Sequence, residues 1–254
     1  MSKEKRLDKL GDRMKSYERI ETSQTFRPNS ILYVRLDGRG FSKFTKGLLR
    51  PYDKNMSTLM IETAKSLVKN FNCVISYIQS DEISLIIRND YGSLAIFDGK
   101  KQKMISTMAA HASAFFTSNL PEYLPSKVGE VPTFDCRIFE VPNVVEAVNA
   151  LYWREKKKKK NSVSMASHDN FSHKELHKKN VKDMKDMLLN CKGIQWDEYP
   201  SFFKYGTYCR RELYEKIGSD NVPVIRSRIG IIDGNLSSYE SIEDKIKFVF
   251  EDKS

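Results

Sequence analysis

The stretch V-R-L-D-G-R-G-F at Val34–Phe41 ends a short apolar run in a carboxylate that is followed by two glycines. A second stretch, Q-S-D-E-I at Gln79–Ile83, places Asp81 and Glu82 at the end of another apolar run. The chain between them has the length of one strand–helix–strand excursion. If the two strands are neighbours in one sheet, Asp37 and Asp81 meet at the same edge.

Hydrophobic periodicity around these stretches predicts an alternation of strands and helices. The expected strands are Ile31–Leu36, Cys73–Ile78, Ile83–Ile87 and Phe134–Val141, and the expected helices follow Asp53, span Lys103–Phe116 and span Val144–Trp153. This order is typical of a ferredoxin-like βαββαβ antiparallel sheet with its helices on one face. The sequence therefore predicts an α+β fold. An amphipathic helix is expected within residues 3–21, and the last thirty residues have only a loose pattern.

The composition favours an anionic partner. The 254 residues carry a formal net charge of +10, and the pI is about 9.3. RNA or DNA is the leading partner class, although a lysine excess can also serve solubility. There is no apolar run long enough for a membrane span and no apolar signal core at the N-terminus, so we expect a cytoplasmic protein.

The paired carboxylates predict a magnesium-dependent site. Mg²⁺ prefers oxygen ligands and binds through one or two carboxylates together with substrate phosphates. Asp37 and Asp81 supply such carboxylates, and the exposed backbone of Gly38 offers a carbonyl. Glu82 is a third candidate, although in a regular strand it faces the other way. Either segment alone is better explained as an ordinary turn, whereas both at one sheet edge favour metal.

A nucleoside triphosphate also needs cations near the carboxylates. Candidates that follow the first carboxylate or open the helix after the third strand are Arg39, Lys43, Arg50, Lys100 and Lys103. The five-lysine run is a candidate RNA contact or a solvated charge run in a flexible loop, and it consists of Lys156, Lys157, Lys158, Lys159 and Lys160. From these residues alone, a palm-type nucleotide cyclase and a non-catalytic RNA-binding protein stay open as alternatives.

Several motifs together resemble the tRNA-His guanylyltransferase superfamily over roughly residues 5–212. In order, they are L-D-G-R-G-F-S-K-F, R-P-Y-D, Q-S-D-E-I-S, F-D-C-R, Y-W-R, K-N-S-V-S-M, F-S-H and F-F-K-Y-G-T. The resemblance implies a polymerase-palm catalytic core, which we assign to residues 1–141, and a C-terminal extension with tRNA-contacting segments over 142–254. It also implies two Mg²⁺ ions, ATP and GTP or other nucleoside triphosphates as substrates, tRNA as partner and a homodimer or homotetramer.

The resemblance implies roles for individual residues. Asp37 and Asp81 hold metal, with the Gly38 carbonyl and with Glu82 close behind. The nucleotide contacts implied are Gly38, Arg39, Gly40, Phe41, Arg50, Ser80, Asn161 and Lys204. The activity implied is nucleotide addition to the 5′ end of tRNA in the 3′-to-5′ direction, after activation of the 5′-monophosphate by ATP or GTP.

One departure from the family's motifs bears on which reaction we expect. Eukaryotic enzymes that add guanosine to tRNA-His carry H-I-N-N-L after the Trp-Arg helix, whereas Lys159–Met165 reads K-K-N-S-V-S-M here. This is similar to the guanylyltransferase-like branch, which uses base pairing as a template to repair 5′-truncated tRNAs. We therefore expect template-dependent repair ahead of guanosine addition to tRNA-His.

Overall fold

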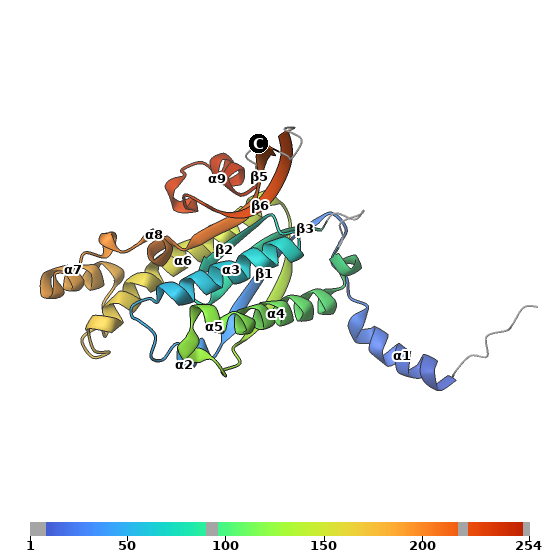
Figure 1. Cartoon of the computed structure of the whole chain (residues 1–254), viewed down its shortest axis with the longest axis horizontal. Helices are drawn as coiled ribbons and strands as arrows, with labels where there is room; N and C mark the ends of the chain where they lie inside the picture. The colour runs from blue at the N-terminus through green and yellow to red at the C-terminus, as the bar shows by residue number, and fades with distance from the viewer. Residues whose placement is uncertain (1–8, 90–95, 218–222, 251–254) are drawn as a thin grey trace, which may run out of the picture.

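A computed structural model describes residues 9–89, 96–217 and 223–250, which build one six-stranded antiparallel sheet in the order β4-β1-β3-β2-β5-β6 (Figure 1). The strands are β1 Ser30–Arg39, β2 Ile75–Gln79, β3 Glu82–Asn89, β4 Thr133–Val141, β5 Thr207–Ile217 and β6 Pro223–Ile232. The inner order β4-β1-β3-β2 is that of the expected ferredoxin-like unit, so the predicted α+β class is confirmed. Strand β5 pairs with β2, and the extension thus continues the same sheet.

Nine helices and four short 3₁₀ turns occur in the described part of the chain. The helices are α1 Lys9–Thr22, α2 Phe41–Phe44, α3 Lys54–Asn70, α4 Lys101–Ser118, α5 Leu120–Tyr123, α6 Val144–Asn170, α7 Val181–Lys192, α8 Ser201–Tyr205 and α9 Ile242–Phe250. The 3₁₀ turns are η1 Ile96–Gly99, η2 Pro125–Lys127, η3 Trp196–Glu198 and η4 Leu236–Ser238. The predicted cap of α3 is present, because the carboxylate of Asp53 accepts the backbone N–H of Met56 at 3.0 Å.

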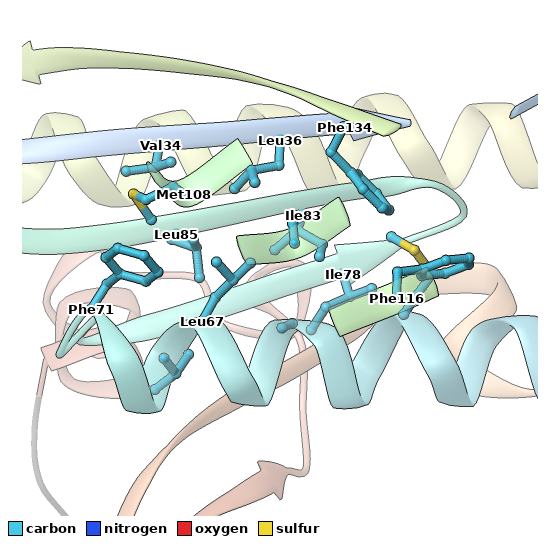
Figure 2. Packing of buried hydrophobic residues seen from close by; sticks show 14 of the residues in the cluster. Val34, Leu36, Leu67, Phe71, Ile78, Ile83, Leu85, Met108, Phe116 and Phe134 are labelled. Carbon is cyan, nitrogen blue, oxygen red and sulfur yellow. The ribbon is translucent and has the colours of Figure 1, made fainter. Parts of the chain in front are cut away.

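Helices α3 and α4 cover one face of the sheet, as expected for the βαββαβ unit (Figure 1). Alternate residues of β1, such as Val34 and Leu36, point into this layer and are fully buried. Figure 2 shows Leu67 of α3 and Phe116 of α4 directed at the same strands. Burial of each such side chain contributes about 1.5–3 kcal/mol. This layer is the main hydrophobic core.

Helices α6 and α9 lie on the opposite face (Figure 1). The side chain of Asn143 accepts the backbone N–H of Glu146 at 3.0 Å and so starts α6 directly after β4. Leu151 and the neighbouring apolar residues of α6 pack on Tyr33 and Tyr77. The flexible loop expected for the five-lysine run is wrong, because α6 continues through it to Asn170. Lysine is a good helix former, and buried residues before and after the run anchor the helix.

The expectation of a loosely patterned C-terminal tail is also wrong. Residues 223–250 form β6, η4 and α9. A buried carboxylate, Glu155 of α6, accepts the backbone N–H groups of Leu236 and Ser237 at 2.7 Å each, and the Tyr208 hydroxyl at 2.8 Å. These bonds fasten the C-terminal segment to α6 and β5. Their partners lie far apart in sequence, which is why local periodicity did not indicate the arrangement.

The expected amphipathic helix α1 is present, although residues 3–8 of that prediction lie outside the described residues. Its apolar stripe, which includes Leu10, Met14 and Tyr17, is exposed in the single chain. Within residues 9–89, 96–217 and 223–250, no helix is long and apolar enough to cross a membrane.

Candidate active site

The polar end of the sheet is a row of four side chains on the face that carries α6. Asp37 of β1 lies opposite Glu82 of β3 and opposite Asp135 of β4, and Glu82 lies opposite Gln79 of β2. Directly opposed residues of neighbouring strands project to the same side of a sheet. The strand register therefore gathers carboxylates that are distant in sequence.

The two carboxylate-bearing segments are tied together by their backbones. The N–H of Gly38 donates a 3.0 Å hydrogen bond to the carbonyl oxygen of Asp81. Ser80 makes this approach possible by turning the β2–β3 hairpin with φ at 57°, a left-handed conformation. A Cβ atom at Gly38 would lie 2.4 Å from the ring of Phe41, so only glycine fits there. The structure thus brings Asp37 and Asp81 to one sheet edge.

The electrostatics of this edge suit a bound cation. Partial burial raises the pKa of Asp37, and the nearby charges of Asp81 and Glu82 raise it further, while Lys158 acts in the opposite direction. Excess negative charge is thus concentrated where a divalent ion would relieve it. The donors that fit Mg²⁺ are the carboxylates of Asp37 and Asp81 and the carbonyl of Gly38. No cluster of three or more His, Cys, Asp or Glu side chains in metal-binding arrangement occurs among the described residues.

Glu82 differs from the other two carboxylates because it is already neutralised. Its side chain is 6% exposed and accepts the Arg154 Nε at 2.7 Å and a second, short bond from the same guanidinium. The ammonium of Lys158 lies 3.5 Å from Oε2 of Glu82, the oxygen that also accepts the second Arg154 bond. A bidentate arginine pair of this kind is strong and geometrically fixed. Glu82 therefore holds α6 against the sheet and is a weaker candidate for a metal ligand than Asp37 or Asp81.

A cavity of about 520 Å³ opens beside Asp81. Five residues of the predicted site line it, namely Arg50, Ser80, Asp81, Lys158 and Asn161. Other lining residues include Ser42, Thr45, Tyr52, Gln79, Ser162, Met165, His168, Phe202 and Phe203. The volume falls in the range of small-molecule sites. Carboxylates, cations, hydroxyls and aromatic rings thus meet in one concave place.

The structure does not bring every predicted residue to the cavity. Lys100 and Lys103 lie at the start of α4, where Lys103 sits over Phe97. The other end of α4 carries Phe116, which contacts Phe41 beside the carboxylates. An eighteen-residue helix is about 27 Å long, so the two lysines lie at the opposite end of this chain's sheet. They therefore do not reach the cavity of the same chain, and their nucleotide contact stays a prediction.

The remaining predicted nucleotide residues lie near the cavity without lining it. Arg39 and Gly40 form the exposed turn into α2, where Gly40 takes φ at 68°, and Lys43 is an exposed residue of α2. The Lys204 ammonium donates a short bond to the Asp197 carbonyl and packs over the Trp196 ring. Lys204 is thus occupied by α8 and η3, next to the lining residue Phe203.

Helical geometry splits the five-lysine run into different surroundings. Lys158 faces the carboxylate row, as its contact with Glu82 shows. Lys156 lies over the ring of Tyr152, Lys157 over Trp153 and Lys159 over Tyr205. Lys160 is exposed. The run is therefore not one uniform RNA contact.

Two features of the site were missed in the sequence. Arg154 and Lys158 are four residues apart on α6, a spacing that places both on one helix face, and this was the available signal. The second feature is a buried bridge to α8, in which the Gln79 amide donates to the Phe203 carbonyl at 2.7 Å and the Tyr77 hydroxyl donates to Gln79 at 3.0 Å. No local pattern predicts that bridge.

Comparison with known proteins shows which family the chain resembles. Residues 11–142 match the family model described as tRNAHis guanylyltransferase. A bacterial tRNA(His) guanylyltransferase-like protein solved in complex with ATP is 33% identical, with a TM-score of 0.82 over 95% of this chain and 99% of that one. A second structure with the same description, in complex with GTP, is 31% identical and has a TM-score of 0.78 over 96% of this chain and 100% of that one.

Curated relatives extend the match to whole chains. An uncharacterised protein of Acanthamoeba polyphaga mimivirus is 30% identical, covering 95% of this chain and 89% of its own length. The tRNA(His) guanylyltransferase of Saccharomyces cerevisiae is 26% identical, covering 76% of this chain and 87% of its own length. Because the family model spans just over half of the chain and the viral relative matches nearly all of it, the chain belongs to the tRNA(His) guanylyltransferase family of nucleotidyltransferases.

Proposed function

We propose that this protein adds nucleotides to the 5′ end of tRNA in the 3′-to-5′ direction, as a template-dependent repair enzyme for 5′-truncated tRNAs. The observation that carries the proposal is the cavity of about 520 Å³ beside the paired carboxylates. Its lining combines Asp81 with the cation of Arg50 and the hydrogen-bonding groups of Ser80 and Asn161. The K-K-N-S-V-S-M stretch in place of H-I-N-N-L favours repair over guanosine addition to tRNA-His.

The nucleotide substrates are ATP or GTP for activation and a nucleoside triphosphate for addition. The 5′-monophosphate of the RNA attacks the α-phosphate of the activating nucleotide, and pyrophosphate leaves. The 3′-hydroxyl of the incoming nucleotide then attacks the activated 5′ phosphate, and the nucleoside monophosphate leaves. In support, the bacterial relatives were solved with ATP and with GTP.

Residues of this chain have distinct tasks in the proposal. Asp37, Asp81 and the Gly38 carbonyl would hold magnesium, which when bound stabilises negative charge on phosphate oxygens and lowers the pKa of a coordinated hydroxyl. Arg50 binds triphosphate oxygens, and Asn161 hydrogen-bonds the nucleotide from α6. Glu82 positions Arg154 and Lys158 beside the row. The protein acts in the cytoplasm as a homodimer or homotetramer.

The test uses tRNA that carries a 5′-monophosphate and lacks its first nucleotide. Incubation with ATP, magnesium and the four nucleoside triphosphates should extend the RNA by the nucleotide complementary to the opposing base. A matched RNA with that opposing base changed should receive the new complement. Extension that ignores the opposing base would contradict templated repair, and a product from GTP alone that elutes as a cyclic nucleotide would favour the cyclase alternative.

A further inference from the structure

Helix α6 crosses the sheet obliquely and leaves part of one face uncovered. It starts beside β4, where Val148 packs near Val141. It then reaches β3, where Arg154 and Lys158 contact Glu82. Beyond that point Lys159 lies over Tyr205 of α8. The edge strand β4 and the adjacent part of β1 are consequently left open next to Asp37.

The uncovered part, which we term the open face, consists of Arg35, Asp37, Arg137 and Phe139 from the sheet with Trp153 and Lys157 from α6. Arg35 lies opposite Arg137, and Tyr33 lies opposite Phe139 one step further along the strands. The side chain of Arg137 is 56% exposed, Phe139 is 48% exposed and Trp153 is 57% exposed. Half-exposed aromatic rings beside arginine side chains offer a ligand both stacking and phosphate contacts.

The rings of Phe139 and Trp153 are held in place by neighbouring side chains. The Phe139 ring lies 5.2 Å from that of Tyr33, which is buried. On the helix, the cations of Arg154 and Lys157 lie 5.1 Å and 5.7 Å from the Trp153 ring. Both rings are thus preorganised while one side of each stays accessible, and this reduces the entropic cost of stacking a ligand on them.

The charge of the open face suits a polyanion. Arg35, Arg137 and Lys157 outnumber the two carboxylates at this face, Asp37 and Asp135, which lie opposite each other on β1 and β4, and Asp135 lies 3.4 Å from Arg137. Arginine binds phosphate through its planar guanidinium, and aromatic rings stack on nucleobases without regard to sequence. The row then ends at Asp37, the carboxylate of the candidate reaction centre.

We propose that the open face binds the RNA substrate near its reacting 5′ end. In this arrangement Arg35 and Arg137 contact phosphates, and Phe139 and Trp153 stack on bases. The cavity is lined by Arg50, Asp81 and Asn161 and by none of the residues of the open face, so in this arrangement RNA and triphosphate approach the carboxylates from different directions. This inference rests on the proposed function and adds to it the path of the polynucleotide.

The test measures binding of 3′-labelled, 5′-truncated tRNA to the full chain by fluorescence anisotropy. Phe139→Ala and Trp153→Ala should each raise the Kd for RNA about 10-fold, as loss of a stacked base does. Arg137→Gln should lower the slope of log K against log salt by about 1. The KM for ATP should stay unchanged in all three variants. Lys69→Gln and Val128→Ala are matched controls, since both residues are exposed outside the open face.

The outcomes separate this inference from the proposed function. RNA that binds the three variants as tightly as it binds the controls would overturn the open face as its site, even if extension proceeds. RNA that binds through the open face but is never extended would sink the proposed function and leave this inference standing. A change of oligomeric state in light scattering, with RNA affinity intact, would identify the face as a protein interface and overturn the inference. Thermal melting of each variant checks that it is folded.

Discussion

The backbone N–H of Gly38 donates a hydrogen bond of 3.0 Å to the backbone carbonyl of Asp81. This bond joins two segments that are separated in sequence by α2, α3 and β2, and it involves neither carboxylate. The carboxylates are therefore positioned by the backbone and by strand register, not by any attraction between themselves. Their mutual repulsion is tolerated because the surrounding sheet fixes them.

Neutralising one carboxylate should abolish turnover while the fold persists. We expect Asp81→Asn to lower the extension rate by more than the ~10–100-fold loss that removal of a metal's supporting partner causes. The Gly38 bond to the Asp81 backbone does not depend on the side chain, so the thermal midpoint should not fall. Asp186→Asn, on exposed α7, is the matched control. Full extension by Asp81→Asn would contradict the role of Asp81 as a metal ligand.

Glu82 and Arg154 should behave as one structural unit. Glu82→Gln or Arg154→Gln leaves a buried charge without its partner, and loss of one partner of such a pair costs about 3–5 kcal/mol of unfolding free energy. The double variant should lose less than the sum of the two single losses. Urea denaturation measures this cycle. If Glu82→Gln changed the magnesium dependence of extension and Arg154→Gln did not, Glu82 would be a metal ligand after all.

The lysines of α6 should separate into two functional classes. Lys158 neighbours Glu82 at 3.5 Å and acts on Asp37, so Lys158→Ala should lower kcat with little change in the salt dependence of RNA binding. Lys160 is exposed, and Lys160→Ala should reduce the salt slope by about 1 without lowering kcat, if it contacts a phosphate. Identical effects of the two substitutions would contradict this division.

Gly206 should be intolerant of a side chain. A Cβ atom there would lie 2.5 Å from the Tyr77 ring and 2.7 Å from the Ile78 carbonyl, and φ is +83°. Gly206→Ala therefore combines left-handed strain, about 1–3 kcal/mol, with displacement of α8 from the sheet. Gly129→Ala is the control, since its φ is +94° but nothing lies within 4 Å. Equal losses of thermal midpoint would show that backbone strain alone is responsible.

His111 should make stability fall in acid. Burial lowers its pKa, and its Nε2 lies 2.8 Å from the Ser66 hydroxyl. The unfolded chain therefore takes up a proton on this residue at higher pH than the folded chain does. Its stabilising contribution is complete above about pH 6.5 and is lost as the pH falls below that value.

The measurement is the unfolding free energy at several pH values on both sides of about 6.5. His111→Gln should flatten the dependence in that range, whereas His177→Gln, at an exposed position, should leave it unchanged. A wild-type curve that is already flat there would contradict the assignment.

Local sequence was sufficient for the four strands β4-β1-β3-β2 of the sheet and for their carboxylate edge. Short apolar runs on both sides of the Gln79–Glu82 bend predicted the strands, and the Asp53 cap predicted the start of α3. These signals depend only on residues a few positions apart in sequence, so they do not require knowledge of the tertiary structure. The position of Asp37 opposite the β2–β3 hairpin followed from the strand–helix–strand order alone.

Tertiary packing decided how the remaining charged residues are used. In sequence Asp81 and Glu82 are adjacent carboxylates and Lys156–Lys160 is one uniform run. Because α6 packs on the sheet, Glu82 forms an ion pair with Arg154. Lys158 lies beside Glu82 near Asp37, whereas Lys160 is exposed to solvent. Lys100 and Lys103 lie at the far end of α4, about one helix length from the site. A side chain's role in such cases depends on which distant residue faces it, and periodicity within one segment does not contain that information.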